Sequence, residues 1–269
     1  MMPRELLRLR TLLLPGAFLL LIATGARAQD AGKWCEESYD DDEDRYCEVR
    51  EQTLPATGSV TVDAGPNGGV AVTGGDRNDV KIQAKVYARA ETQSRARQIA
   101  EEVSIRTDGG TIRAEGPKGG EDESWAVSFR LSVPARTDLS LETMNGGIGI
   151  EGVSGDLEFR AVNGGVSLVD VSGYVSGSTT NGGLSIELTG DEWEGEGLDV
   201  KTTNGGVNLQ IPEGYSARLE TGTVNGRLEI GFPVTVQGRL DKMLTTELGS
   251  GGKLIRARTT NGGVKISRG

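Results

Sequence analysis

Residues that commonly carry acid–base or metal chemistry are scarce or poorly arranged in this chain. It contains no histidine, so the commonest general base and metal ligand is missing. Residues 147–152 match G-x-G-x-x-G, but that fingerprint must open a helix, whereas the residues from Ser154 onward alternate as a strand does. Residues 251–253, Gly-Gly-Lys, lack the first glycine and the Ser/Thr of a phosphate loop. The sequence therefore predicts no cofactor and no metal site among these residues.

One group of carboxylates stands around an aromatic residue. Asp191, Glu192, Glu194 and Glu196 flank Trp193 in a chain that is only 4% aromatic. Aromatic rings with nearby carboxylates can hold a sugar or a cationic segment, and the candidate ligand residues are Tyr174, Asp191, Trp193, Glu194, Glu196 and Tyr215. Two other interpretations stand beside this one. The aromatic residues can simply cover the edge of a core, or carboxylates such as Asp191 and Glu194 can serve a carbohydrate-active enzyme.

The two cysteines, Cys35 and Cys47, are predicted to form a disulfide. An even cysteine count in an exported chain favours pairing, and closing so short a loop would stabilise the fold by about 3 kcal/mol on the chain-entropy model. An acidic run, 40–44, lies between them. A solvated loop is the favoured interpretation of that run, because the Asp, Gly and Glu spacing of an EF-hand is absent. A calcium site is the alternative.

The elements that must position these residues belong to a repeat. Asn-Gly returns six times in the C-terminal half, and a second glycine follows in every copy but one, where Arg227 stands; an earlier Asn-Gly-Gly begins at Asn67. The first two intervals are 18 residues long, and the six asparagines are Asn145, Asn163, Asn181, Asn204, Asn225 and Asn261. A short recurring interval of this kind is typical of a solenoid or an array.

Hydrophobic periodicity shows what each repeat contains. Apolar or small residues stand two, four and six positions before each asparagine, and apolar residues stand three and five positions after it. This is the period of two of half-buried strands, with a change of parity at the glycines. We expect strand, corner and strand in each repeat, a positive φ at the corner glycines, and inward asparagines that form a ladder. Antiparallel hairpins with Asn-Gly turns are the alternative.

The longer intervals place their extra residues at one edge. These insertions, 189–197, 212–215 and a stretch within 231–253, all fall at the corner opposite Asn-Gly. Insertions gathered on one edge of a repeat array often form its binding face. This placement is why Trp193 and Tyr215 are candidates.

Four segments are predicted along the chain. Residues 1–28 read as a secretory signal peptide, and its removal would change the net charge from −10 to −13 because it carries four arginines and one glutamate. Residues 29–52 form the acidic segment with the disulfide. Residues 53–136 form an irregular first part of the β domain with a helix over 91–103, which either caps the stack or packs on a sheet face. Residues 137–269 form the repeat.

The repeat also indicates a family. The Thr-Thr-Asn-Gly-Gly pattern at 179–183, 202–206 and 259–263, with the signal peptide and the strand register, resembles the bacterial "putative adhesin" β-solenoid domains of unknown function. These toast-rack domains are akin to autotransporter-adhesin head domains, and the resemblance covers about residues 53–269. It implies a non-catalytic cell-envelope or extracellular module and brings no catalytic residues.

The sequence thus predicts an all-β protein, a β-solenoid of about 18-residue Asn-Gly-Gly coils with one helix. We expect an exported, adhesin-like binding or structural module, periplasmic or on the cell surface, whose partner is an envelope glycan or protein. The alternative is the carbohydrate-active enzyme. A chain this acidic is not expected to bind nucleic acid or anionic lipid unaided, and no segment after the signal is expected to span a membrane.

Overall fold

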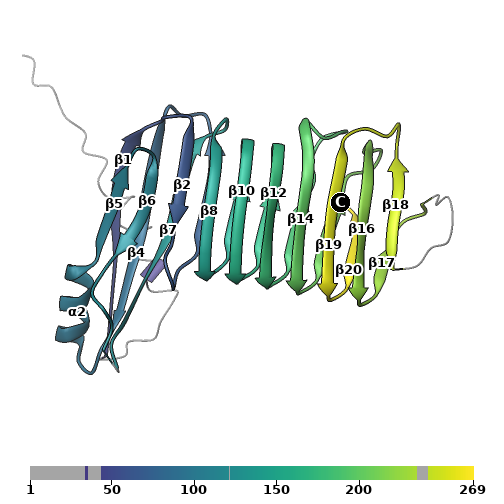
Figure 1. The fold of residues 1–269 in the computed structure, drawn as a ribbon. Helices are drawn as coiled ribbons and strands as arrows, with labels where there is room; N and C mark the ends of the chain where they lie inside the picture. The colour runs from purple at the N-terminus through teal and green to yellow at the C-terminus, as the bar shows by residue number, and fades with distance from the viewer. Residues whose placement is uncertain (1–33, 36–43, 121, 235–241) are drawn as a thin grey trace, which may run out of the picture.

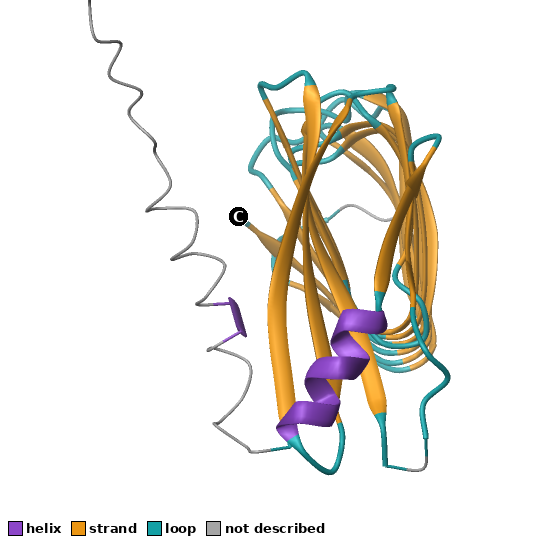
Figure 2. Cartoon of the chain, turned by 90° about the vertical axis from the view of Figure 1, so that its left-hand side faces the viewer, coloured by secondary structure: helices purple, strands orange, loops and turns teal. Residues whose placement is uncertain are grey.

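A computed structural model describes residues 34–35, 44–120, 122–234 and 242–269. The chain forms two ten-stranded sheets, sheet A and sheet B, which face one another (Figures 1 and 2). The inward residues of both sheets make a single apolar core, as expected when each strand buries one face. The predicted all-β fold is confirmed. Among the described residues, one helix is longer than a single turn. The predicted signal peptide, 1–28, lies outside the described residues.

The middle of the molecule follows the repeat. Parallel strands in sheet B alternate along the chain with parallel strands in sheet A, and their bounds are β8 (Asp138–Asn145), β9 (Ile148–Glu151), β10 (Ser154–Asn163), β11 (Val166–Val169), β12 (Ser172–Asn181), β13 (Leu184–Glu187), β14 (Gly195–Asn204) and β15 (Val207–Ile211). Each strand pairs in register with its equivalent one repeat away, so that Leu157 lies opposite Leu139 and Val175. The two strands that flank an Asn-Gly corner belong to different sheets. The hairpin alternative is therefore wrong.

The last repeat is inserted out of chain order. β19 (Leu254–Asn261) pairs with β14 on one side and with β16 (Ala217–Asn225) on the other. Likewise β20 (Val264–Arg268) lies between β15 and β17 (Leu228–Ile230), and β18 (Met243–Leu248) pairs antiparallel with β16 at the outer end (Figure 1). The last two strands in the sequence, β19 and β20, therefore lie inside the stack and not at its end.

The N-terminal part ends the stack on the other side. In sheet A, β1 (Arg45–Pro55), β4 (Asp79–Arg89) and β7 (Ser124–Pro134) are antiparallel, and β7 joins the parallel part through β3 (Val70–Gly75). In sheet B, β2 (Ser59–Asp63) pairs with β8 and with β6 (Thr111–Glu115), which forms a hairpin with β5 (Ser104–Asp108). Antiparallel strands therefore flank a parallel centre.

The helix α2 (Gln93–Glu102) covers the N-terminal end of the core. Thr92 caps it by accepting a hydrogen bond from the Arg95 amide at 3.3 Å, and its buried residues are Ala96, Ile99 and Ala100. The Arg50 guanidinium of β1 donates to the Ala100 carbonyl at 2.7 Å, a carbonyl at the C-terminal end that also accepts from the Val103 amide at 3.1 Å. Figure 2 looks onto this end and shows α2 across the opening between the end strands of the sheets. The helix packs against β1 and β4 of sheet A and also covers this opening, so the arrangement has features of both alternatives.

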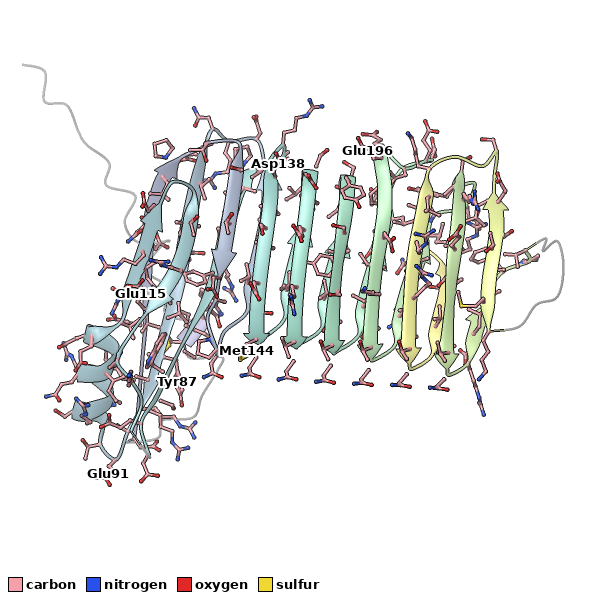
Figure 3. The ribbon with its side chains drawn as sticks, viewed as in Figure 1. Tyr87, Glu91, Glu115, Asp138, Met144 and Glu196 are labelled. Atoms are coloured by element: carbon pink, nitrogen blue, oxygen red, sulfur yellow. A yellow bond between two sulfur atoms is a disulfide. The ribbon has the colours of Figure 1, made fainter. Side chains whose placement is uncertain are left out.

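The asparagines form a ladder, but its predicted inward orientation is wrong. All six are exposed. In the spatial order Asn145, Asn163, Asn181, Asn204, Asn261 and Asn225, each side-chain amide after the first donates at 2.8 Å to the side-chain carbonyl of the asparagine before it. The Asn145 amide donates in the same way to Asn67 at 3.2 Å. Figure 3 shows a regular row of side chains along the lower edge of the stack, from near Met144 onward. The strand turns away from the core at its last two residues, so the period of two ends before the asparagine.

Threonines two residues before the asparagines supply the buried ladder instead. Thr179, Thr202 and Thr259 are buried, and each hydroxyl donates at 2.7 Å to the carbonyl of the corner glycine in the adjacent repeat. A buried hydroxyl needs such a partner. Sequence reasoning placed these residues inward without assigning them this bond.

At four of the corners the first glycine is required by close approach and not by positive φ, although Gly262 at the last corner has a φ of 156°. Gly146, Gly164, Gly182 and Gly205 have no positive φ. A Cβ on Gly164 would lie 2.0 Å from the carbonyl oxygen of Gly146, whereas a Cβ on the following Gly165 would meet nothing closer than 3.5 Å. Only the first glycine of each corner is therefore sterically fixed, which explains why Arg227 can replace the second.

Candidate functional site

Of the three aromatic residues predicted to contact a ligand, two are buried and one is exposed. Trp193 and Tyr215 are buried, with 5% and 1% of their surfaces exposed, and both belong to the core. The Trp193 indole donates to the Gly173 carbonyl at 3.0 Å. Tyr174 lies apart from them on the outside of sheet B and is 44% exposed. The alternative that Trp193 and Tyr215 cover the core edge is the one observed, so their ring faces are not open platforms for a ligand.

A hollow nevertheless exists at this corner, and we call it the corner pocket. Its volume is about 360 Å³, and its lining includes Asp170, Asp191, Glu192, Glu194 and Tyr215. The residues come from three neighbouring repeats: Asp170 follows β11, the loop 188–194 follows β13, and Tyr215 precedes β16. Asp191 and Glu194, the pair named for the enzyme alternative, both border it, whereas Glu196 does not.

Short backbone and side-chain bonds fix the walls of the corner pocket. The Ser216 amide donates to the Asp191 carbonyl and the Gly173 amide donates to the Glu194 carbonyl, both at 2.7 Å. The Thr189 hydroxyl donates to the Asp170 carboxylate, and Asp170 has a φ of 51°, the one positive value at a non-glycine residue among the described ranges. The pocket is thus held in shape by the stack itself.

The environment of Tyr215 is both apolar and acidic. Burial raises the pKa of its phenol to about 12, with further contributions from the Glu192 and Glu194 carboxylates. These two carboxylates therefore lie near enough to act on the phenol. The hydroxyl remains protonated at physiological pH and is available as a donor or an acceptor.

A second hollow, the sheet A groove, lies on the outer face of sheet A. It measures about 690 Å³ and crosses neighbouring parallel strands, where its floor consists of the small outward residues Ala71, Gly149, Ser167, Ser185 and Asn208. Four of these stand four positions after a repeat asparagine. The small side chains at that position were the sequence signal for this groove, and sequence reasoning missed it.

Trp34 forms one wall of the sheet A groove. Its ring centre lies 3.9 Å from the guanidinium carbon of Arg130 and 5.2 Å from the Lys85 ammonium, as in cation–π contacts. The predicted disulfide between Cys35 and Cys47 is confirmed, and it ties this segment to β1. The tryptophan is therefore fastened onto the outer face of sheet A.

The remaining site predictions concern metals and membranes. Across the part of the chain that the structure describes, no three acidic, cysteine or histidine side chains converge closely enough to hold a metal ion. Most of the acidic run between the cysteines, with its possible calcium site, lies outside the described residues. Among the described helices, none is both long and apolar enough to cross a bilayer.

The repeat, the two facing sheets and the corner geometry define a family. The sequence profile of the Toastrack DUF4097 family matches residues 78–267, and the chain belongs to that family. The resemblance seen in the Asn-Gly-Gly pattern is thereby confirmed.

Solved structures show similar chains at low identity. A "putative cell adhesion protein" from Clostridium sporogenes is 9% identical with a TM-score of 0.44, and the match covers 82% of this chain and 100% of that one. A "putative adhesin" from Bacteroides fragilis is 8% identical with a TM-score of 0.41 and coverages of 83% and 97%. A "putative lipid binding protein" from Parabacteroides distasonis is 9% identical, with a TM-score of 0.32 and coverages of 83% and 96%. Comparison with curated proteins gave no match.

Proposed function

We propose that this chain is an exported, non-catalytic, adhesin-like binding or structural module of the bacterial cell envelope, built on a β-solenoid. The observation that carries the proposal is the sheet A groove, an open hollow of about 690 Å³ across the outer face of the parallel strands. A pocket of this size lies within the range of ligand-binding sites. Its partner is an envelope glycan or protein.

The groove suits an extended ligand. Ser167, Ser185 and Asn208 repeat along the stack at the spacing of parallel strands, roughly 4.8 Å, so polar groups recur at regular intervals along the floor. Trp34 closes one end with a large ring, a residue type that dominates binding energy where it is exposed to a partner. The floor is built on strands, which hold such a surface more rigidly than loops do.

Two further features support the location. The Cys35–Cys47 disulfide is typical of proteins that fold outside the cytoplasm. The signal-like segment 1–28 is the corresponding expectation from sequence. Periplasmic and cell-surface placement are both compatible with them.

A glycan array and an envelope pull-down with the mature protein test the proposal. Ser185→Lys puts a long charged side chain on the groove floor and should abolish binding, while Ser140→Lys, an exposed position on the outer face of sheet B, should leave it intact. Equal binding by both variants, or no binding of the native chain to any envelope component, would contradict the groove as the site. Turnover of a bound glycan would favour the carbohydrate-active alternative.

A further inference from the structure

The corner pocket is bordered by carboxylates for which the described residues provide no ion-pair partner. Asp170, Asp191, Glu192 and Glu194 border it, and no ion pair among the described residues includes any of them. All four residues are exposed, whereas the half-buried Glu220 accepts two bonds from Arg256 at 2.9 and 2.7 Å. A concave site lined by negative charges concentrates a negative electrostatic potential, which attracts any cation that enters.

The second observation is the hydroxyl of Tyr215. The residue is 1% exposed and borders the corner pocket, and its hydroxyl has no hydrogen-bond partner among the described residues. The oxygen is not among the fully buried polar atoms that lack a partner, so the small exposed part of this side chain leaves the hydroxyl accessible to a ligand in the pocket. Glu192 and Glu194 border the same hollow as Tyr215, and their carboxylates contribute to the raised pKa of its phenol.

The chemistry of the lining decides which cation fits. A bare divalent ion needs several oxygen ligands at short range, and the described residues hold no converging set of three such groups. A volume of about 360 Å³ is far larger than a metal ion requires and accommodates a short alkyl chain. An ammonium group has three donors and no acceptor, which matches a lining of carboxylates and one phenol oxygen.

We propose that the corner pocket binds the ammonium end of an alkylamine, either a free polyamine or the lysine side chain of a protein partner. Tyr215 accepts one N–H bond, and Glu192 and Glu194 supply the opposing charge. Because the walls are fixed by the stack, little conformational freedom is lost when the cation enters. This inference does not rest on the sheet A groove, and either site can fail alone.

Calorimetric titration of the mature protein tests it with defined probes. These are 1,5-diaminopentane, an uncharged pentanol, a blocked Gly-Lys-Gly peptide and calcium chloride, each raised to about 10 mM, where millimolar binding still registers. We expect saturable binding of the diamine or the lysine peptide at one site, weakened by salt, and none of pentanol. The better of the two amine probes identifies the source of the group.

Variants locate the binding within the chain. The double variant Glu192→Gln/Glu194→Gln should raise the Kd for the amine at least tenfold, since losing a hydrogen bond to a charged group changes Kd by about a factor of ten or more. Tyr215→Phe keeps the packing of the ring and should weaken amine binding about tenfold. The matched control, Asp156→Asn with Glu158→Gln on the outer face of sheet B, removes the same charge and should leave binding unchanged.

Several outcomes would overturn the inference. They are the absence of saturable amine binding, binding of calcium in place of the amines, or an equal loss in the control variant, which would mean diffuse electrostatic attraction. Thermal melts of every variant show whether it is folded. A folded Tyr215→Phe protein with undiminished affinity would remove the phenol from the site.

Discussion

The close approach of neighbouring repeats at the Asn-Gly-Gly corners gives a sharp test of the stack. Gly164 and Gly165 are adjacent in the same Asn-Gly-Gly corner, but an alanine methyl at each would meet very different surroundings. At Gly164 the methyl carbon would lie 2.0 Å from the Gly146 carbonyl oxygen and 2.5 Å from its carbon. At Gly165 the nearest atom, the carbonyl oxygen of Gly183, is 3.5 Å away, which is an ordinary van der Waals distance.

The expected loss follows from these distances. To accept Gly164→Ala, two backbones must separate by more than 1 Å, because an ordinary contact is about 3.4 Å or longer. Overpacking of this kind costs about 1–3 kcal/mol, and the shift also weakens the Gly146 and Gly164 amide bonds, 3.1 and 3.0 Å long, at about 1 kcal/mol each. The total is about 3 kcal/mol or more. Gly165→Ala should be neutral or slightly stabilising, because alanine restricts the unfolded chain.

Equilibrium unfolding in urea, followed by circular dichroism, measures the difference. The urea concentration at the unfolding midpoint should fall for Gly164→Ala and remain unchanged for Gly165→Ala. The dependence of the unfolding free energy on urea concentration should be the same in both variants. Equal losses would refute the close approach of the corners. A loss below about 1 kcal/mol for Gly164→Ala would show that neighbouring repeats separate easily, contrary to the close packing of protein interiors.

Further predictions concern the ladder, acid stability and export. Asn181→Ala removes two exposed amide bonds and should cost about 1 kcal/mol in urea unfolding, against about half of that for Asn225→Ala at the ladder's end, where one bond is lost; equal losses would contradict the ladder. The Arg256 guanidinium lowers the pKa of Glu220 below its ordinary 4.5, so its stabilisation is present above about pH 4.5 and is lost as the pH falls through the folded-state pKa. Glu220→Gln should therefore flatten the acid side of a stability–pH curve, and an unchanged slope would argue against the pair. Intact mass should place the mature N-terminus at Gln29, and thiol titration without reductant should find no free thiol; two reactive thiols would contradict the disulfide.

The strand pattern was predictable from sequence because one physical rule governs it. Each strand buries one face, so Leu139 and Leu141 before a corner and Ile148 and Ile150 after it could be placed inward from periodicity alone. The same rule failed at Asn145, which has the correct parity but lies beyond the last buried residue. Parity carries information only while the strand remains against the core.

Other features lay beyond local pattern. Every repeat has the same motif, so the motif cannot specify which repeat neighbours which, and the insertion of β19 and β20 was not foreseen. The position of Trp34 depends on a disulfide and on cations from two distant strands, Lys85 and Arg130. The corner pocket was found only in part: Asp191, Glu192, Glu194 and Tyr215 were named from sequence, but Asp170, which comes from an earlier repeat, is brought to the pocket only by the fold.

The inserted repeat has a consequence for the order of events as the polypeptide emerges. Units β8 to β15 can stack one by one as they appear, each on the unit before it. The pair β16 and β17 cannot, since the surface on which it rests belongs to β19 and β20, which are made later. A polypeptide that breaks off before Leu254 would leave β16 and β17 without that support and leave β14 and β15 as bare, pairing-competent edges. Quality control that recognises such edges could therefore distinguish an unfinished chain from a finished one.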